Sequence, residues 1–503
     1  NFSPSSILQT IFKINNSTTT RNFRTPAAGP FILELQITLQ PDKLLTSLTS
    51  SEKSHLMLTE ILLQQTKSAR QAAQVLATTP TEQKDALLQK LAHVIREQQT
   101  KILDENQKDM TVAQQMVREG ELSESAYRRM LLSPAKIEQI ANSVEAVAKL
   151  SDPVGQVGLG TRLDAGLDLY RVSTPIGVIL VIFESRPDAL VQISSLSLKS
   201  GNAVILKGGR EVQKTNVILA SLIRDTLKEV QLPVDAVNLV TTREEVAQLV
   251  QLSEQLDLII PRGSNALVQH IQKHAQVPVL GHAEGICHVF VDDEAHPEKA
   301  LNVVVDAKTD YPAVCNAVET LLLHQDHPVV SVQSILKALH EAGVELRVCE
   351  ETRVKFCGGL EIPVKSATTE DWITEYTDLI LAVKTVPGLK DAIQHINTCS
   401  SHHTDAIVTE HPGHAQEFLQ QVDSAGVFWN ASTRFADGFR YGFGAEVGVS
   451  TCRTHARGPV GLEGLVIHKY LLYGSGQGAG DYGVGKREFC HEPLPQTLPQ
   501  LHS

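Results

Sequence analysis

Apolar residues first recur at helical spacing along the chain and later gather in short continuous runs. Residues 51–120 follow the helical pattern, and one predicted helix face is formed by Leu87, Leu88, Leu91, Val94 and Ile95. The segment Thr79-Pro80-Thr81-Glu82 precedes this face and predicts a capping box with proline at the first helical position. The first part of the chain is therefore predicted to be helical.

Short apolar runs then alternate with amphipathic segments. Strands are predicted at residues 178–183, 203–206, 237–240, 258–260 and 277–280, and helices at residues 189–199, 212–230, 244–252 and 265–274. This alternation indicates βαβ units and a mostly parallel sheet, which binds ligands at the carboxyl ends of its strands. Just before it, the glycine-rich residues 154–171 predict a hairpin that could serve assembly.

A second α/β segment is predicted from about residue 288. It includes strands at 379–383 and 427–430 and a helix that begins near Pro312. Cys315 would then lie close to a helix N-terminus, where free N–H groups and the helix dipole stabilise the nucleophilic thiolate. The alternative is a buried structural cysteine, which is the commoner role of a lone cysteine.

Composition narrows the class of protein. The chain has 503 residues, 42% of them hydrophobic and 20% charged, which suggests two or three globular domains. A net charge of -12 without a long basic run argues against a nucleic-acid partner. The sequence contains no run of 18 apolar residues, so no membrane span is expected. Seven cysteines without a CxxC pair argue against structural zinc or a disulfide framework and favour a reducing compartment.

The first 30 residues are rich in Ser, Thr and Asn, contain basic residues and lack acidic ones. That composition is typical of a transit peptide, and a disordered extension is the alternative. The expected location is the cytoplasm, or an organelle if the extension is a transit peptide.

Two βα turns carry candidate groups for a nucleotide. The first is Lys207-Gly208-Gly209-Arg210, in which the planar fork of Arg210 could take a ribose 2′-phosphate. The second is Pro261-Arg262-Gly263-Ser264, whose N–H groups could face a pyrophosphate. The alternative for the first turn is an ordinary solvated turn. The alternative for the second is a capped βα turn, and the lack of the usual GxGxxG fingerprint there gives the nucleotide interpretation no support.

Further along, four arginines lie within about 25 residues, interleaved with Gly and Ser: Arg434, Arg440, Arg453 and Arg457. Such a stretch suits recognition of a carboxylate or phosphate, although a solvated surface is an equal alternative. The neighbouring histidines His402 and His403 lack metal-ligand spacing and are interpreted as ordinary surface or core residues. No metal site is expected.

Seven blocks of the chain together resemble the γ-glutamyl phosphate reductase family, which also forms the reductase half of pyrroline-5-carboxylate synthase. They are residues 181–188, 201–209, 257–264, 279–288, 310–316, 427–435 and 455–463. The blocks occur in family order and the resemblance runs from about Glu60 to Tyr473. It implies the α/β aldehyde dehydrogenase fold, in which a Rossmann-type parallel sheet binds the cofactor and a second α/β domain carries the catalytic cysteine.

The resemblance also implies domain limits. Residues 1–50 would be a disordered or targeting extension, and residues 51–280 the NADP-binding domain with an assembly hairpin at about 152–172. The catalytic domain would span residues 281–460, and residues 461–503 would return to complete the oligomerisation segment. A homo-oligomer is therefore expected, with glutamate 5-kinase as a candidate partner and a small-molecule substrate.

The activity implied by the resemblance is the NADPH-dependent reduction of L-glutamyl 5-phosphate to L-glutamate 5-semialdehyde in proline biosynthesis. Cys315 falls at the nucleophile, and Ser185 replaces the oxyanion asparagine of the superfamily, so that backbone N–H groups near Cys315 and Asn316 would carry more of that role. The cofactor would be bound by Lys207, Arg210, Gly263, Ser264 and Glu375. The substrate would be bound by Arg186, Arg434, Arg453, His455 and Arg457.

Two alternatives remain at this point. The general-base glutamate of the oxidising relatives falls near Gly281 and is missing, which together with Arg210 argues against an aldehyde oxidiser of the same fold. An intact neighbourhood of Cys315 argues against a non-catalytic scaffold.

Overall fold

The structure, a computed structural model, describes residues 50–183, 185–263, 265–281 and 284–499. The predicted N-terminal extension therefore lies almost entirely outside the described residues. Contacts divide the chain into Asn1–Leu56 and Met57–Ser503, and the second unit contains both parallel sheets and the hairpin. Within the described residues, no helix combines the length and apolar character needed to cross a membrane.

The first sheet consists of four parallel strands in the order β5-β4-β3-β6. Their bounds are β3 Val178–Ile182, β4 Ala203–Lys207, β5 Val237–Val240 and β6 Leu258–Pro261. The predicted fifth strand at residues 277–280 is wrong, because this segment makes only an isolated bridge between Ile259 and Val279. Pro278 has no N–H with which to extend a ladder, which explains why pairing stops there.

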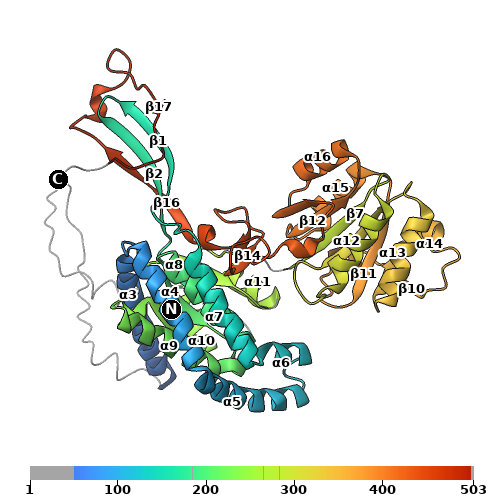
Figure 1. Cartoon of the computed structure of the whole chain (residues 1–503), viewed down its shortest axis with the longest axis horizontal. Helices are drawn as coiled ribbons and strands as arrows, with labels where there is room; N and C mark the ends of the chain where they lie inside the picture. Colours follow the sequence, from blue (N-terminus) through green and yellow to red (C-terminus); the bar gives the residue numbers. More distant parts are fainter. Residues whose placement is uncertain (1–49, 184, 264, 282–283, 500–503) are drawn as a thin grey trace, which may run out of the picture. The chain divides into compact units, whose positions relative to one another are not determined.

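Helices cover both faces of this sheet (Figure 1). One face packs against α4 (Thr81–Glu97), α7 (Pro134–Lys149), α8 (Pro187–Lys199) and α9 (Gln213–Glu229). The other face packs against α3 (Ser50–Leu76), α10 (Arg243–Leu249) and α11 (Asn265–His274). Burial on both faces is the reason that these strands read as continuous apolar runs in the sequence.

The start of α4 differs from the predicted capping box. Pro80 is the N-cap residue, and the Thr79 hydroxyl donates to the carbonyl of Val75 (3.0 Å). The hydroxyl of Thr81 donates instead to the Asp152 carboxylate (2.8 Å). A tertiary contact has therefore replaced the local cap.

The second sheet has seven parallel strands in the order β10-β9-β11-β8-β7-β12-β13. They are β7 Cys287–Val291, β8 Val318–His324, β9 Glu345–Val348, β10 Val364–Ser366, β11 Ile380–Val386, β12 Thr404–Val408 and β13 Gly426–Trp429. Helices α12 (Pro297–Thr309), α13 (Val329–Glu341) and α14 (Glu350–Phe356) pack on one face, and α15 (Leu389–Cys399) and α16 (Pro412–Gln421) on the other (Figure 1).

The predicted helix around Cys315 is wrong. Cys315 lies in a turn between α12 and β8, and the apolar run that follows it is the central strand β8. Short buried strands and buried helices share such runs, so the sequence pattern could not separate them. The helix-dipole argument for activating Cys315 therefore does not apply.

The predicted hairpin is confirmed as β1 (Val157–Asp164) and β2 (Leu167–Pro175). Strands β16 (Val466–Tyr473) and β17 (Glu492–Pro493) extend it to a sheet in the order β16-β2-β1-β17. The edge strand β16 exposes Ile467, Tyr470 and Leu472. Residues from the end of the chain therefore complete the sheet that the hairpin begins.

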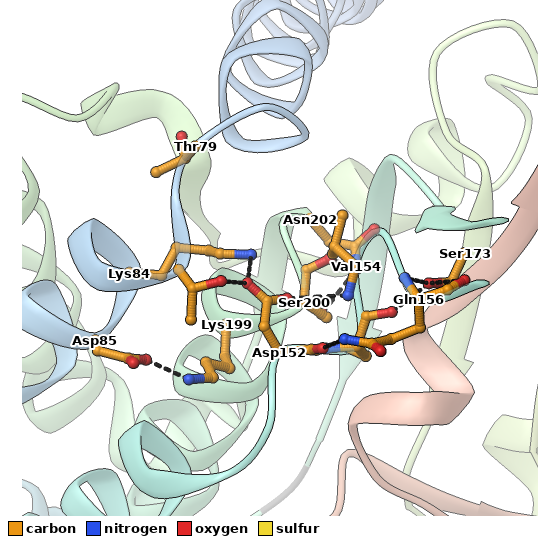
Figure 2. A network of polar contacts seen from close by, with 12 residues as sticks. Thr79, Lys84, Asp85, Asp152, Val154, Gln156, Ser173, Lys199, Ser200 and Asn202 are labelled. Carbon is orange, nitrogen blue, oxygen red and sulfur yellow. Dashed lines mark hydrogen bonds and ion pairs between the residues drawn. The ribbon is translucent and has the colours of Figure 1, made fainter. Parts of the chain in front are cut away.

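A polar network ties the base of the hairpin to α4 and α8 (Figure 2). Asp152 forms an ion pair with Lys84, whose side chain is only 1% exposed, and accepts a hydrogen bond from the N–H of Val154 (3.0 Å). Lys199, which is fully buried, pairs with Asp85 and donates to the carbonyl of Ala148 (3.0 Å). Each buried ammonium thus has a carboxylate partner, as burial of a charge requires.

Candidate active site

Cys315 is half-buried in the turn that leads from α12 into β8. A Cβ atom added at Gly285, which precedes β7, would lie only 2.5 Å from Cys315 Cα and 2.6 Å from its Cβ. The thiol of Cys287 donates to the carbonyl of Cys315 (3.3 Å). Close packing against Gly285 and the hydrogen bond from Cys287 therefore hold the turn in place.

His403 faces the thiol of Cys315. Its Nε2 lies 3.1 Å from Cys315 Sγ, and its Nδ1 lies 2.9 Å from the hydroxyl of Thr404. The side chain is buried at the start of β12. The sequence interpretation of His403 as an ordinary histidine missed this contact, because the two residues lie 88 positions apart.

Asn316 is held by a network of charged side chains. Its amide donates to the carbonyl of Ala436 (2.9 Å), and its carbonyl oxygen accepts from the buried Arg434. Arg434 also pairs with Asp310 (3.1 Å), as does Arg440 (3.0 Å). The hydrogen bond from Arg440 and the charge of Arg434 lower the pKa of Asp310. Arg434 therefore positions the turn beside Cys315, and its predicted contact with substrate remains a prediction.

Ser185 adopts a positive φ of 45° just after β3. Its N–H and its hydroxyl each donate to Glu211 Oε1 at 2.8 Å. The neighbouring Arg186 pairs with Asp188 (2.9 Å). The oxyanion role predicted for Ser185 would use groups that Glu211 engages here, and that role remains a prediction.

The predicted cofactor residues lie at the carboxyl edge of the first sheet. Lys207 ends β4 and donates to the carbonyl of Gly208 (2.8 Å), beside a small hollow lined by Gly208, Gly209, Gln213, Asn216 and Thr241. A Cβ at Gly208 would come within 2.1 Å of Asn216 Nδ2, so a larger residue there would displace the Asn216 side chain at the edge of the hollow. Arg210 is exposed and pairs with Glu121 (2.6 Å).

Gly263 follows β6, next to Arg262, and Ser264 lies outside the described residues. The Arg262 guanidinium pairs with Glu446 (3.3 Å), and burial lowers the pKa of Arg262 and raises that of Glu446. Glu375, in the second sheet's half of the chain, is half-buried shortly before β11. The following Thr377 N–H donates to Glu319 (3.4 Å), a carboxyl whose pKa burial raises to about 7.

Two of the remaining predicted substrate residues, Arg453 and Arg457, meet at Asp423. Arg457 donates to its Oδ1 (2.8 Å), and Arg453 pairs with its Oδ2. His455 lies between them in sequence, with Nε2 3.0 Å from the carbonyl of Gly464. The structure thus brings Arg453 and Arg457 together and ties His455 to a different segment.

Among the described residues, one group could hold a metal ion: Asp292, Asp293 and His414. Asp292 directly follows β7 at the carboxyl edge of the second sheet, whereas Gly285 precedes the amino end of the same strand. Asp292 accepts hydrogen bonds from Thr409 and His414, both at 2.7 Å. These bonds join Asp292, Thr409 and His414 in a hydrogen-bond network at the strand end.

Comparison with known proteins decides the family. Residues 59–354 match the model of the aldehyde dehydrogenase family. The chain is 47% identical over 430 residues to a gamma-glutamyl phosphate reductase of Acetivibrio thermocellus, an alignment that covers 86% of this chain and 97% of the relative. It is also 47% identical to a probable gamma-glutamyl phosphate reductase of Schizosaccharomyces pombe, with 85% of this chain and 96% of the relative covered. This chain belongs to the gamma-glutamyl phosphate reductases.

A crystal structure supports the same assignment. The gamma-glutamyl phosphate reductase of Thermotoga maritima superposes with a TM-score of 0.78 at 40% identity, over 82% of this chain and 98% of that chain. The predicted aldehyde dehydrogenase fold is therefore confirmed. As a gamma-glutamyl phosphate reductase, the protein is an oxidoreductase of proline biosynthesis.

In this reductase, Gly285→Ala should strongly reduce turnover. The added methyl group would overlap the backbone of Cys315 and push the turn away from His403. Misplacement of a reacting group by about 1 Å costs on the order of 10²-fold in rate. The control is Gly358→Ala, because a Cβ there meets no atom within 4 Å. Steady-state kcat measures both, and an unchanged kcat for Gly285→Ala would contradict this packing.

Proposed function

We propose that the protein reduces L-glutamyl 5-phosphate to L-glutamate 5-semialdehyde and releases phosphate, with NADPH as the reductant and a thioacyl intermediate on Cys315. The observation that carries the proposal is the position of Cys315, half-buried in a fixed turn beside His403, in a chain of this family. The names of its relatives, gamma-glutamyl phosphate reductases, indicate the substrate and the direction of the reaction.

The proposed reaction begins at Cys315 and passes through a thioester. The Cys315 thiolate attacks the acyl carbon, and phosphate leaves as the thioester forms. Backbone N–H groups near Cys315 and Asn316, with Ser185, stabilise the oxyanion of the tetrahedral intermediate. Bound NADPH would supply the hydride that reduces the thioester. The thiolate then leaves, and the aldehyde cyclises to pyrroline-5-carboxylate.

The residues at the carboxyl edge of the first sheet fit NADP. Gly208 and Gly209 line the hollow after β4, and Lys207 ends that strand, at the edge where an open parallel sheet binds nucleotides. Arg210 is exposed, and its surface ion pair with Glu121 is worth at most about 1 kcal/mol, so exchange for a phosphate is inexpensive. Gly263, Ser264 and Glu375 are proposed to contact the pyrophosphate and the nicotinamide ribose.

Replacing Arg210 by alanine should therefore weaken NADPH more than NADH. Loss of a charge-assisted bond to the 2′-phosphate should raise KM for NADPH roughly 10- to 100-fold. KM for NADH should change less than twofold, because NADH lacks that phosphate. Arg224→Ala is the control, because Arg224 on α9 binds the carboxylate of Asp235 and the carbonyl of Val234. Equal changes for both cofactors would show that Arg210 does not read the phosphate.

Substrate anions are proposed to be held by Arg453, Arg457 and His455, and by Arg186 and Arg434 in two other blocks of the family resemblance. The side chain of Arg453 is 77% exposed, and both Arg453 and Arg457 pair with Asp423. A substrate carboxylate could therefore replace Asp423 as the partner of Arg453 without leaving a buried charge unpaired. We further propose a homo-oligomer formed through the sheet that ends in β16, and glutamate 5-kinase as a partner. The cytoplasm is the proposed location, or an organelle if the first residues direct import.

The reverse reaction tests this function. Purified protein is mixed with pyrroline-5-carboxylate, phosphate and NADP⁺, and NADPH is followed by absorbance. The proposal predicts a rate that requires phosphate, prefers NADP⁺ to NAD⁺ and disappears on thiol alkylation. Oxidation without phosphate would indicate an aldehyde dehydrogenase instead, and the absence of a rate with either cofactor would indicate a non-catalytic scaffold.

A further inference from the structure

Cys315 and His403 form a pair whose geometry suits proton transfer. The 3.1 Å between Cys315 Sγ and His403 Nε2 is hydrogen-bonding distance for sulfur. When Nδ1 carries the imidazole proton, it can donate to the Thr404 hydroxyl at 2.9 Å. The lone pair of Nε2 then faces the thiol, so Thr404 fixes the ring in the orientation that a base requires.

Among the described residues, the charged groups of Asp405 and Arg434 are bound to other partners, whereas His403 is in direct contact with the thiol. On β12, Asp405 accepts from His288 (2.9 Å) on β7 and from Ser400 (2.9 Å), so its carboxylate is engaged elsewhere. Cys287 on β7 donates to the Cys315 carbonyl. On the short helix Thr433–Phe435, Arg434 is bound to Asp310 and Asn316.

We propose that His403 is the general base and acid of this active site: it takes the proton of Cys315 and delivers it to the departing phosphate. This role rests on the proposed function. The departing phosphate needs a proton, and the thiol of Cys315 can provide one. His403 would carry that proton from the thiol to the phosphate.

The step balances in atoms and charge. Proton transfer from Sγ to Nε2 gives a thiolate and an imidazolium. The S–C bond forms, the C–O bond to phosphate breaks, and Nε2–H protonates the leaving oxygen, so that HPO₄²⁻ departs instead of PO₄³⁻. His403 is neutral again when the thioester is complete. After the thioester is reduced, the thiolate leaves and regains a proton from solvent.

The test compares wild type with His403→Gln, whose amide can reach Sγ but cannot carry the proton. Iodoacetamide modification of the Cys315 peptide is measured by mass spectrometry at about pH 7 and at about pH 9.5, where an ordinary thiol ionises without a base. Modification should slow about tenfold or more at the lower pH and approach the wild-type rate at the higher one. The control is His340→Asn on α13, in which Cys315 should be modified at the wild-type rate at both pH values.

Turnover in the reverse assay supplies the second readout. His403→Gln should lose about 10²- to 10⁴-fold in kcat and should not recover at high pH, because attacking HPO₄²⁻ must still give up its proton. His403→Asn gives an independent variant if the first folds poorly. Equal modification of Cys315 in wild type and variant at about pH 7, or a deficit that persists at about pH 9.5, would overturn the proposal.

The two proposals fail differently. Alkylation needs neither cofactor nor substrate, so it reports on the pair even if the reductase activity is absent. A wild-type protein without phosphate-dependent turnover but with the expected alkylation pattern would reject the proposed function and retain the Cys315–His403 pair.

Discussion

Replacing Cys315 by alanine is expected to abolish phosphate-dependent turnover while leaving NADPH binding intact. Removal of a nucleophile that forms a covalent intermediate costs on the order of 10⁴-fold or more, because no other group can carry the acyl chain. The substitution removes one partly exposed sulfur from a turn, so the fold should survive. Turnover is measured in the reverse assay and NADPH binding by fluorescence titration.

The matched control is Cys357→Ala. Cys357 is the C-cap residue of α14 and takes no part in the proposed chemistry. Burial raises the pKa of its thiol. It should retain wild-type kcat. Residual turnover in Cys315→Ala within about tenfold of wild type would contradict a covalent route through this residue.

The second large effect concerns stability. Asp152→Ala should lower the free energy of unfolding by about 3–5 kcal/mol, because it leaves the ammonium of Lys84 buried without its carboxylate. It also removes the acceptor for the Thr81 hydroxyl. The N–H of Val154 loses its acceptor as well (Figure 2). Urea unfolding followed by circular dichroism measures the change.

Two companion variants separate the buried charge from other effects. Adding Lys84→Met to Asp152→Ala should recover a good part of the loss, since it removes the unpaired charge. Glu229→Ala breaks an exposed pair with Lys90 (3.1 Å) and should cost less than about 1 kcal/mol. Equal losses for Asp152→Ala and Glu229→Ala would show that the network in Figure 2 does not stabilise the fold.

The sequence predicted the parallel sheets because their strands are buried on both faces. Val178–Ile182 and Ala203–Lys207 read as unbroken apolar runs, and helical spacing between them fixed the alternation. The same logic failed at β8, where a buried strand was interpreted as a helix that carried Cys315. Local pattern contains no information on which neighbours a short apolar run will meet.

The candidate site was predictable only where chemistry is local or family motifs mark it. Cys315 was found from its motif, although the helix expected to activate it is absent from the described turn. His403 was missed, because its contact with Sγ depends on β12 and β8 lying in one sheet with their amino ends at one edge. Arg434 was predicted to bind substrate, which remains a prediction, and the structure shows it bound to Asn316 and Asp310.

The central claim is that an acyl group passes through Cys315. The most direct measurement is mass analysis of acid-quenched protein after one turnover with NADP⁺ and pyrroline-5-carboxylate, with and without phosphate. A covalent route predicts a glutamyl adduct on the Cys315 peptide that forms with one NADPH per site and disappears when phosphate is added. Phosphate-dependent NADPH formation with an unmodified Cys315 at every time point would contradict it.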